Sequence, residues 1–224
     1  MYFWCMIIPA LILVLCAQFA VKGTYRKYSR VQSRAGQSGA AVARRLLDRH
    51  GLYDVPVERI RGNLTDHYDP RHRAVRLSEG VYDGASIASV AVAAHETGHA
   101  VQHAEHYAPL AMRSAILPVA SFGSSAGVAL FLLGLFIQAI PFLMELGIVL
   151  FACAVLFQVV TLPVEFNASS RALEFLGSEA ILNGHEENSG ARKMLNAAAL
   201  TYVAAAIMAV LQLLRFVLIA SGRN

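Results

Sequence analysis

The run HETGH, at residues 95–99, contains the residue types that a helix needs to bind a metal ion and to activate water. The spacing of His95 and His99 places both imidazoles on one helix face, about one turn apart, where they can chelate one zinc ion. The same turn directs Glu96 toward a zinc-activated water, as the general base of a hydrolase requires. Because a five-residue pattern recurs by chance, the interpretation depends on what the rest of the chain places around these residues.

A catalytic zinc commonly takes three protein ligands and keeps a fourth position for water. The extended pattern HExxHxxGxxH is excluded, because Gln102 and Glu105 stand where it has glycine and histidine. We therefore expect a carboxylate on a separate downstream helix. Glu165 fits, because it directly follows an apolar stretch that would return the chain across a membrane. Glu174 and Glu179 are rival carboxylates, and each has the alternative interpretation of a solvated charge on a helix.

The composition indicates a membrane protein. The 224-residue chain is 56% hydrophobic and 15% charged, whereas soluble domains carry about 25% charged residues; its mean hydropathy is +0.50. The net charge of +4 is therefore attributed to a cytoplasmic membrane face and not to nucleic-acid binding. Cys5, Cys16 and Cys153 all lie in apolar runs and are interpreted as small buried hydrophobes.

Long apolar segments predict four transmembrane helices. Residues 1–21 are expected to form an uncleaved anchor, because no basic residues precede the apolar run as they do in a signal peptide. Residues 115–164 predict a transmembrane hairpin with its connection at Pro141, and residues 197–220 predict a fourth span. The small residues from Gly123 to Gly127 are interpreted as a face for close helix packing within this protein.

Two polar segments, residues 22–114 and 165–196, carry seventeen of the nineteen lysines and arginines. With four spans, both segments lie on the same side of the membrane, and the positive-inside rule identifies that side as the cytoplasm. The first segment is the predicted catalytic segment with the HETGH helix. The second is the predicted cytoplasmic helix with the third zinc ligand.

Periodicity within the first polar segment predicts a helix over residues 36–50, ended by Gly51. Residues 55–77 change to short apolar pieces, including Leu64, that are broken by turns and predict two or three short strands. Ser86 is the predicted N-cap of a further helix over residues 87–104, with HETGH in its middle. The predicted fold class is a mainly α membrane protein with a small α+β, zincin-like catalytic region.

Other residues near the motif are interpreted more conservatively. Gly98 is about 1 kcal/mol less favourable than alanine inside a helix, so we expect close packing there, against the helix that carries Glu165. His103 and His106 follow at one-turn intervals and are interpreted as surface or supporting groups rather than ligands. His67, in a strand flanked by turns, is expected to be exposed.

Four sequence blocks, in order, resemble the YugP-type neutral zinc metallopeptidases of bacterial membranes. They are LTDHYDPRHRAVRLSEGVYDG (64–84), AVAAHETGHAVQHAEHYAPLAMR (91–113), LPVEFNASSRALE (162–174) and ARKMLNAAALTYVAAA (191–206). That family looks like a compact relative of the HtpX-type and CAAX-prenyl membrane endopeptidases, which carry a carboxylate ligand in an E-F/Y-x-A-D motif. The resemblance implies a multi-pass protein of the bacterial inner membrane, acting in membrane-protein quality control.

Carried over residue by residue, the resemblance implies that His95, His99 and Glu165 bind one Zn²⁺ per chain, with Glu96 as the general base. Ser169 stands where the wider group has an aspartate that supports a ligand histidine. A hydroxyl can form a hydrogen bond there, but it cannot supply the charge.

The predicted function is hydrolysis of peptide bonds in protein or peptide substrates by a membrane-bound zinc metalloendopeptidase. The alternative is a catalytically silent zinc-binding membrane scaffold or chaperone, which would need the ligands but not Glu96. A transporter is disfavoured because the spans hold almost no ionisable groups, and an intramembrane-cutting protease because charges punctuate the HETGH helix. Peptide can pair with the edge of segment 64–77, and the candidate donors to a reacting oxyanion are Tyr82, Arg171, His185 and Arg192.

Overall fold

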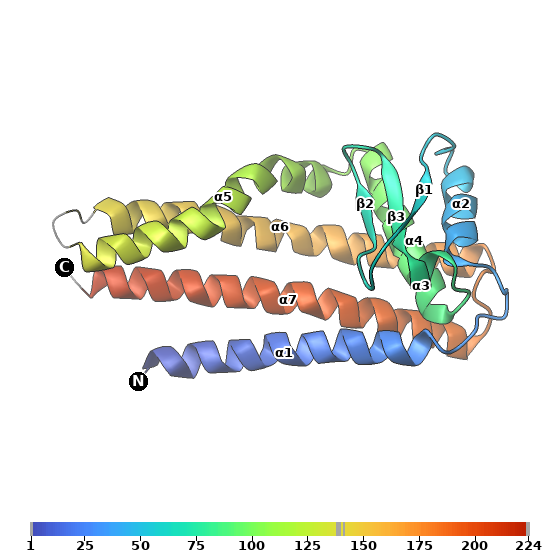
Figure 1. The fold of residues 1–224 in the computed structure, drawn as a ribbon, viewed down its shortest axis with the longest axis horizontal. Helices are drawn as coiled ribbons and strands as arrows, with labels where there is room; N and C mark the ends of the chain where they lie inside the picture. Colours follow the sequence, from blue (N-terminus) through green and yellow to red (C-terminus); the bar gives the residue numbers. More distant parts are fainter. Residues whose placement is uncertain (1, 138–139, 141, 223–224) are drawn as a thin grey trace. The chain divides into compact units, whose positions relative to one another are not determined.

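The computed structural model describes residues 2–137, 140 and 142–222 (Figure 1). The chain is mainly helical, and its elements are α1 (Tyr2–Tyr28), α2 (Gly39–Arg49), β1 (Val57–Ile60), β2 (His67–Asp69), β3 (Ala74–Ser78), α3 (Glu79–Tyr82), α4 (Ile87–Ala104), α5 (Ala108–Phe136), α6 (Phe142–Ser178) and α7 (His185–Ser221). The predicted connection at Pro141 lies outside the described residues. The chain divides into two compact units. The first comprises residues 1–17, 108–163 and 201–224, and the second comprises residues 18–107 and 164–200.

Four helices are long and apolar enough to cross a membrane, namely α1 from Ile7 onward, α5, α6 and α7. They match the four predicted spans in number and order, but they are longer than predicted. Helix α6 passes through Pro163 without ending, and α7 begins at His185, well before the predicted span. The predicted boundaries of the spans mark where charged side chains begin, whereas the helical hydrogen bonding continues past those boundaries.

The first unit is held together by close helix packing and aromatic contacts. A Cβ added at Gly127 of α5 would lie 2.9 Å from the carbonyl oxygen of Gly147 on α6. The predicted packing role of the Gly123–Gly127 stretch is therefore confirmed, because small residues allow two helix backbones to approach closely. Phe131 stacks on Phe216 of α7 with ring centroids 4.0 Å apart.

The second unit contains a three-stranded sheet in the order β1-β3-β2, with β1 parallel and β2 antiparallel to β3. The prediction of short strands is confirmed, but Leu64 is not part of one. It lies in the loop between β1 and β2 with φ of 55° and is 39% exposed, because the turn that begins at Gly62 extends further than the apolar pattern suggested. The sheet packs against α4 (Figure 1).

Helices α2 and α4 form the centre of the core of this unit. Val42, Leu46 and Leu47 of α2 are fully buried, and Gly51 follows the helix with φ of 72°, as the periodicity predicted. Helix α4 has the predicted bounds, and the hydroxyl of Ser86 accepts a hydrogen bond from the Ser89 N–H at 3.1 Å, which confirms the N-cap. The HETGH run therefore sits on a helix that is buried along most of its length.

Candidate metal centre

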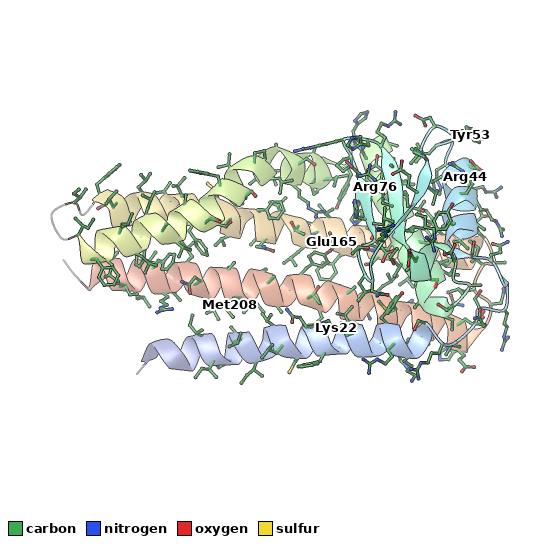
Figure 2. All side chains as sticks on the ribbon, in the orientation of Figure 1. Lys22, Arg44, Tyr53, Arg76, Glu165 and Met208 are labelled. Carbon is green, nitrogen blue, oxygen red and sulfur yellow. The ribbon has the colours of Figure 1, made fainter. Side chains whose placement is uncertain are left out.

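Helices α4 and α6 bring three potential metal donors together. Helix α4 carries His95 and His99, and α6 carries Glu165, which is labelled in Figure 2. Glu165 Oε2 lies 3.3 Å from His95 Nε2 and 3.6 Å from His99 Nε2. One donor atom from each of the three residues falls within 4.8 Å of the others, and the two imidazole rings meet edge to face, with centroids 4.7 Å apart.

These spacings fit a tetrahedral zinc ion. Bonds of about 2.0–2.1 Å at tetrahedral angles separate neighbouring donors by about 3.3–3.4 Å, close to the two observed distances. Glu165 is 2% exposed and His99 is 7% exposed. A carboxylate buried to that extent needs a compensating positive charge, which a divalent cation between the three side chains would supply.

The rival carboxylates have other environments. Glu174 is exposed. Glu179 forms ion pairs with two arginines of α2, at 3.3 Å from Arg45 and 2.9 Å from Arg49. Among the described residues, Glu165 is the carboxylate that lies beside the two histidines, where its position after the third span had suggested it.

Gln102 fixes the tautomer of His99. The amide nitrogen of Gln102 donates to the carbonyl of Val164 and to Asn167 Oδ1, both at 2.9 Å. Because a backbone carbonyl can only accept, the amide oxygen of Gln102 must face His99 Nδ1, 2.9 Å away. His99 Nδ1 therefore carries the proton and donates it, which leaves the Nε2 lone pair directed at the metal position.

Ser169 occupies the corresponding position beside His95. Its hydroxyl oxygen lies 3.2 Å from His95 Nδ1, where the family resemblance suggested a supporting group. Both imidazoles thus use Nδ1 for a hydrogen bond to the protein and turn Nε2 toward Glu165. This orientation is the one that metal-ligating histidines need.

A longer polar network ties the C-terminal end of α4 to α6. Arg171 donates from Nε to Asn167 Oδ1 at 2.9 Å and from Nη2 to Glu105 Oε2 at 2.6 Å. Arg171 was one candidate for stabilising a reacting oxyanion, but these contacts engage its guanidinium in bracing α4 against α6. Of the other candidates, Tyr82 ends α3 and packs against the core, and two are exposed on α7, His185 and Arg192.

Sequence reasoning treated Gln102 only as a departure from an extended zinc motif. The signal that could have identified it is its spacing, since it follows His99 by three residues and so shares the helix face of a candidate ligand. A polar side chain on that face, fully buried in the structure, requires hydrogen-bond partners. Asn167 follows Glu165 by two residues, and nothing in its local spacing pointed to Gln102.

The charges around His99 affect how this candidate centre would bind a metal ion. Burial acts to lower the pKa of His99, but the hydrogen bond and charge of Glu165, together with the charge of Glu96, outweigh burial and raise that pKa above its ordinary value. A proton and a metal ion compete for the same nitrogen. Metal binding is therefore expected to weaken as the pH falls through the raised pKa.

The glycine of HETGH allows the close approach of the two helices. A Cβ added at Gly98 would lie 2.9 Å from the carbonyl oxygen of Ala168 on α6. This contact confirms the expectation that the helix carrying Glu165 packs against Gly98. Ala168 is three residues from Glu165, so displacing this turn of α6 would also move the carboxylate.

Replacing Gly98 with alanine is expected to destabilise the protein by about 1–3 kcal/mol, the usual effect of overpacking, and to weaken zinc binding. Thermal unfolding in detergent and chelator competition measure the two effects. Gly177→Ala is the matched control, because Gly177 lies on α6 with nothing within 4 Å of an added Cβ; it should be neutral or stabilising. Equal zinc affinity in Gly98→Ala and the parent would contradict this role.

Replacing Gln102 with leucine is expected to lower zinc affinity about 10- to 100-fold, the usual effect of losing a hydrogen bond that orients a ligand. Leucine fills similar space but leaves the His99 Nδ1–H without an acceptor. Gln102→Glu restores an acceptor for His99 and should recover part of the affinity, which a purely steric role would not explain. Chelator competition measures both variants, and an unchanged affinity in Gln102→Leu would refute the assignment.

Sequence comparisons are consistent with this centre. A family model described as "Putative neutral zinc metallopeptidase" matches residues 3–221. A protein of Bacillus subtilis (strain 168) named "Putative membrane protease YugP" is 54% identical over 225 residues, covering 100% of this chain and 99% of that protein. A comparison with solved structures finds no match.

Proposed function

This chain belongs to the neutral zinc metallopeptidase family, and from that premise we propose that it is a membrane-bound zinc endopeptidase with a zincin-like site. His95, His99 and Glu165 would hold one Zn²⁺ per chain. The observation that carries the proposal is the convergence of their donor atoms within 4.8 Å, from positions seventy residues apart in the chain. Three protein donors, rather than the four of a structural zinc site, would leave a fourth position for water.

The chemistry expected of zinc, when bound, is to polarise the scissile carbonyl and to lower the pKa of a water molecule toward 7. Glu96 follows His95 on the same helix and is itself only 8% exposed. Its carboxylate takes a proton from the attacking water, and the proton then passes to the nitrogen of the leaving amine. Gln102 and Ser169 hold the imidazoles in place while charge develops.

Cleavage of casein by the purified, detergent-solubilised full chain tests the proposed activity. We expect the chain to produce fragments, and we expect 1,10-phenanthroline, but not a serine-protease inhibitor, to block their formation. A protein that binds one zinc per chain and cleaves neither casein nor shorter peptides would instead support the zinc-binding scaffold or chaperone.

We further propose that the catalytic site faces the cytoplasm of a bacterial cell, with the protein in the inner membrane. The support is the concentration of basic residues in segments 22–114 and 165–196. Reporter fusions at residues 60 and 180 should both report the cytoplasm. Reporters on opposite sides of the membrane would refute the four-span arrangement, and two reporters outside would reverse the orientation.

A further inference from the structure

A cavity of about 370 Å³ lies next to α4 in the same compact unit as the candidate metal centre. Val55 and Ala100 contribute apolar lining, and the polar lining comes from Tyr68, Arg73 and two histidines, His103 and His106. The volume is at the lower end of the range for small-molecule sites. None of the described lining residues is acidic, so the cavity favours an anionic group over a cationic one.

The polar groups that line the cavity include hydrogen-bond donors. Tyr68 Oη and His103 Nδ1 are 2.8 Å apart, with the two rings edge to face. Arg73 Nη1 lies 3.0 Å from Asp54 Oδ2 in an ion pair whose two side chains are both more than half exposed. Because a guanidinium has five N–H donors in a planar fork, this exposed pair leaves donors of Arg73 for a second carboxylate.

Two lining residues hold a backbone conformation that favours glycine. Arg73, in the turn between β2 and β3, has φ of 50°, and His106, after the end of α4, has φ of 55°. Residues other than glycine are uncommon in this left-handed region, and their presence there is associated with functional sites. Here a cationic or titratable side chain stands at both positions, and both side chains line the same cavity.

The cavity follows the proposed catalytic base along α4. Ala100 lies about one helical turn after Glu96, and His103 lies two turns after it, or about 10 Å along the axis. An extended peptide advances about 3.3 Å per residue. Tyr68 belongs to β2, an outer strand of the sheet, where segment 64–77 was expected to pair with a peptide.

We propose that this cavity is a substrate subsite that binds a carboxylate of the peptide. The carboxylate would lie two or three residues from the scissile peptide bond, which is placed beside Glu96. The proposal rests on the proposed peptidase function and adds a substrate preference to it. Arg73 is the main recognition group, with Tyr68, His103 and His106 completing the polar wall. The carboxylate can belong to a Glu or Asp side chain or to the C-terminus of the substrate.

Peptide binding to the full chain carrying Glu96→Gln tests the subsite without cleavage. The probes are fluorescein-labelled decapeptides of alanine and leucine with one Glu at each position in turn, and the same set with Gln. Each is made with a free and an amidated C-terminus. We expect binding about tenfold tighter for Glu than for Gln at one position, as for a charge-assisted contact. If the subsite binds the C-terminus instead, peptides with a free C-terminus should bind about tenfold tighter than amidated ones.

Arg73→Glu, introduced into the Glu96→Gln chain, should abolish or reverse the preference for a carboxylate. Arg71→Glu is the matched control, because it makes the same charge change in the same turn at an exposed residue outside the cavity lining, and it should keep the preference. Zinc content and thermal unfolding verify that both variants are folded. No preference at any position, or an equal preference in Arg73→Glu, would overturn the proposal.

Cleavage of the same peptides by the parent separates this proposal from the function on which it rests. If the parent cleaves them without favouring Glu or a free C-terminus, the subsite is wrong and the peptidase function stands. The opposite outcome is also informative. The Glu96→Gln chain can show the preference, Arg73→Glu can lose it and Arg71→Glu can keep it, while the parent cleaves nothing. In that case the carboxylate site stands and the peptidase function fails.

Discussion

Glu96→Gln is expected to lower kcat/KM for peptide cleavage by about 100- to 10,000-fold, the usual contribution of a general acid–base group, while leaving one zinc per chain. Glutamine has the size of glutamate but cannot take a proton from water at neutral pH. The metal should remain, because the three converging donors come from His95, His99 and Glu165 and not from Glu96. Cleavage rates and zinc content, measured on the same preparation, check both halves of the expectation.

The matched control is Glu174→Gln, which makes the same change at an exposed position of α6. This variant should cleave at the parental rate. If Glu96→Gln cleaved as fast as the parent with zinc in place, Glu96 would not be the base, and the proposed mechanism would be wrong.

Glu165→Ala is expected to lower zinc affinity by about 100-fold or more and to abolish activity with it. Structural zinc sites bind with about 10–16 kcal/mol over four ligands, so the loss of one ligand is a large fraction of the binding free energy. Glu165 is also the only one of the three donors with a negative charge, so the two remaining imidazoles would hold a divalent ion without charge compensation. Zinc content after dialysis against a competing chelator measures the loss.

Glu179→Ala provides the comparison for this prediction, because it removes another carboxylate of the same chain segment. Glu179 pairs with Arg45 and Arg49, so its loss should affect stability and leave zinc bound. Full zinc retention in Glu165→Ala together with loss in Glu179→Ala would reassign the third ligand.

Local sequence patterns predicted how the residues of the candidate site that share one helix are placed. The four-residue spacing of His95 and His99 determines which face they share, and Ser86 marks the start of that helix by its own side chain. Gly98 pointed correctly to a close helix contact, because an interior glycine is unfavourable unless something packs against it. The position of Glu165 followed from chain direction, since the apolar hairpin had to return to the side from which it started.

The parts that sequence could not predict depend on side chains meeting across helices. The amide of Gln102 acts on His99 only because Val164 and Asn167 orient it from α6, and neither of these residues carries a local signal. The cavity was also not predictable, because Arg73 and His106 belong to different turns and line the same cavity only in the folded unit. The left-handed backbone of Arg73 was likewise hidden, since the residue type argues against it.

Titration of zinc into the metal-free full chain, with peptide cleavage followed at each addition, tests the central claim most directly. The proposed zinc peptidase should be inactive without metal and should regain activity in proportion to added zinc, with the rate levelling off at one ion per chain. Full activity in the metal-free protein would contradict the claim, and so would the absence of cleavage once one zinc ion per chain is bound.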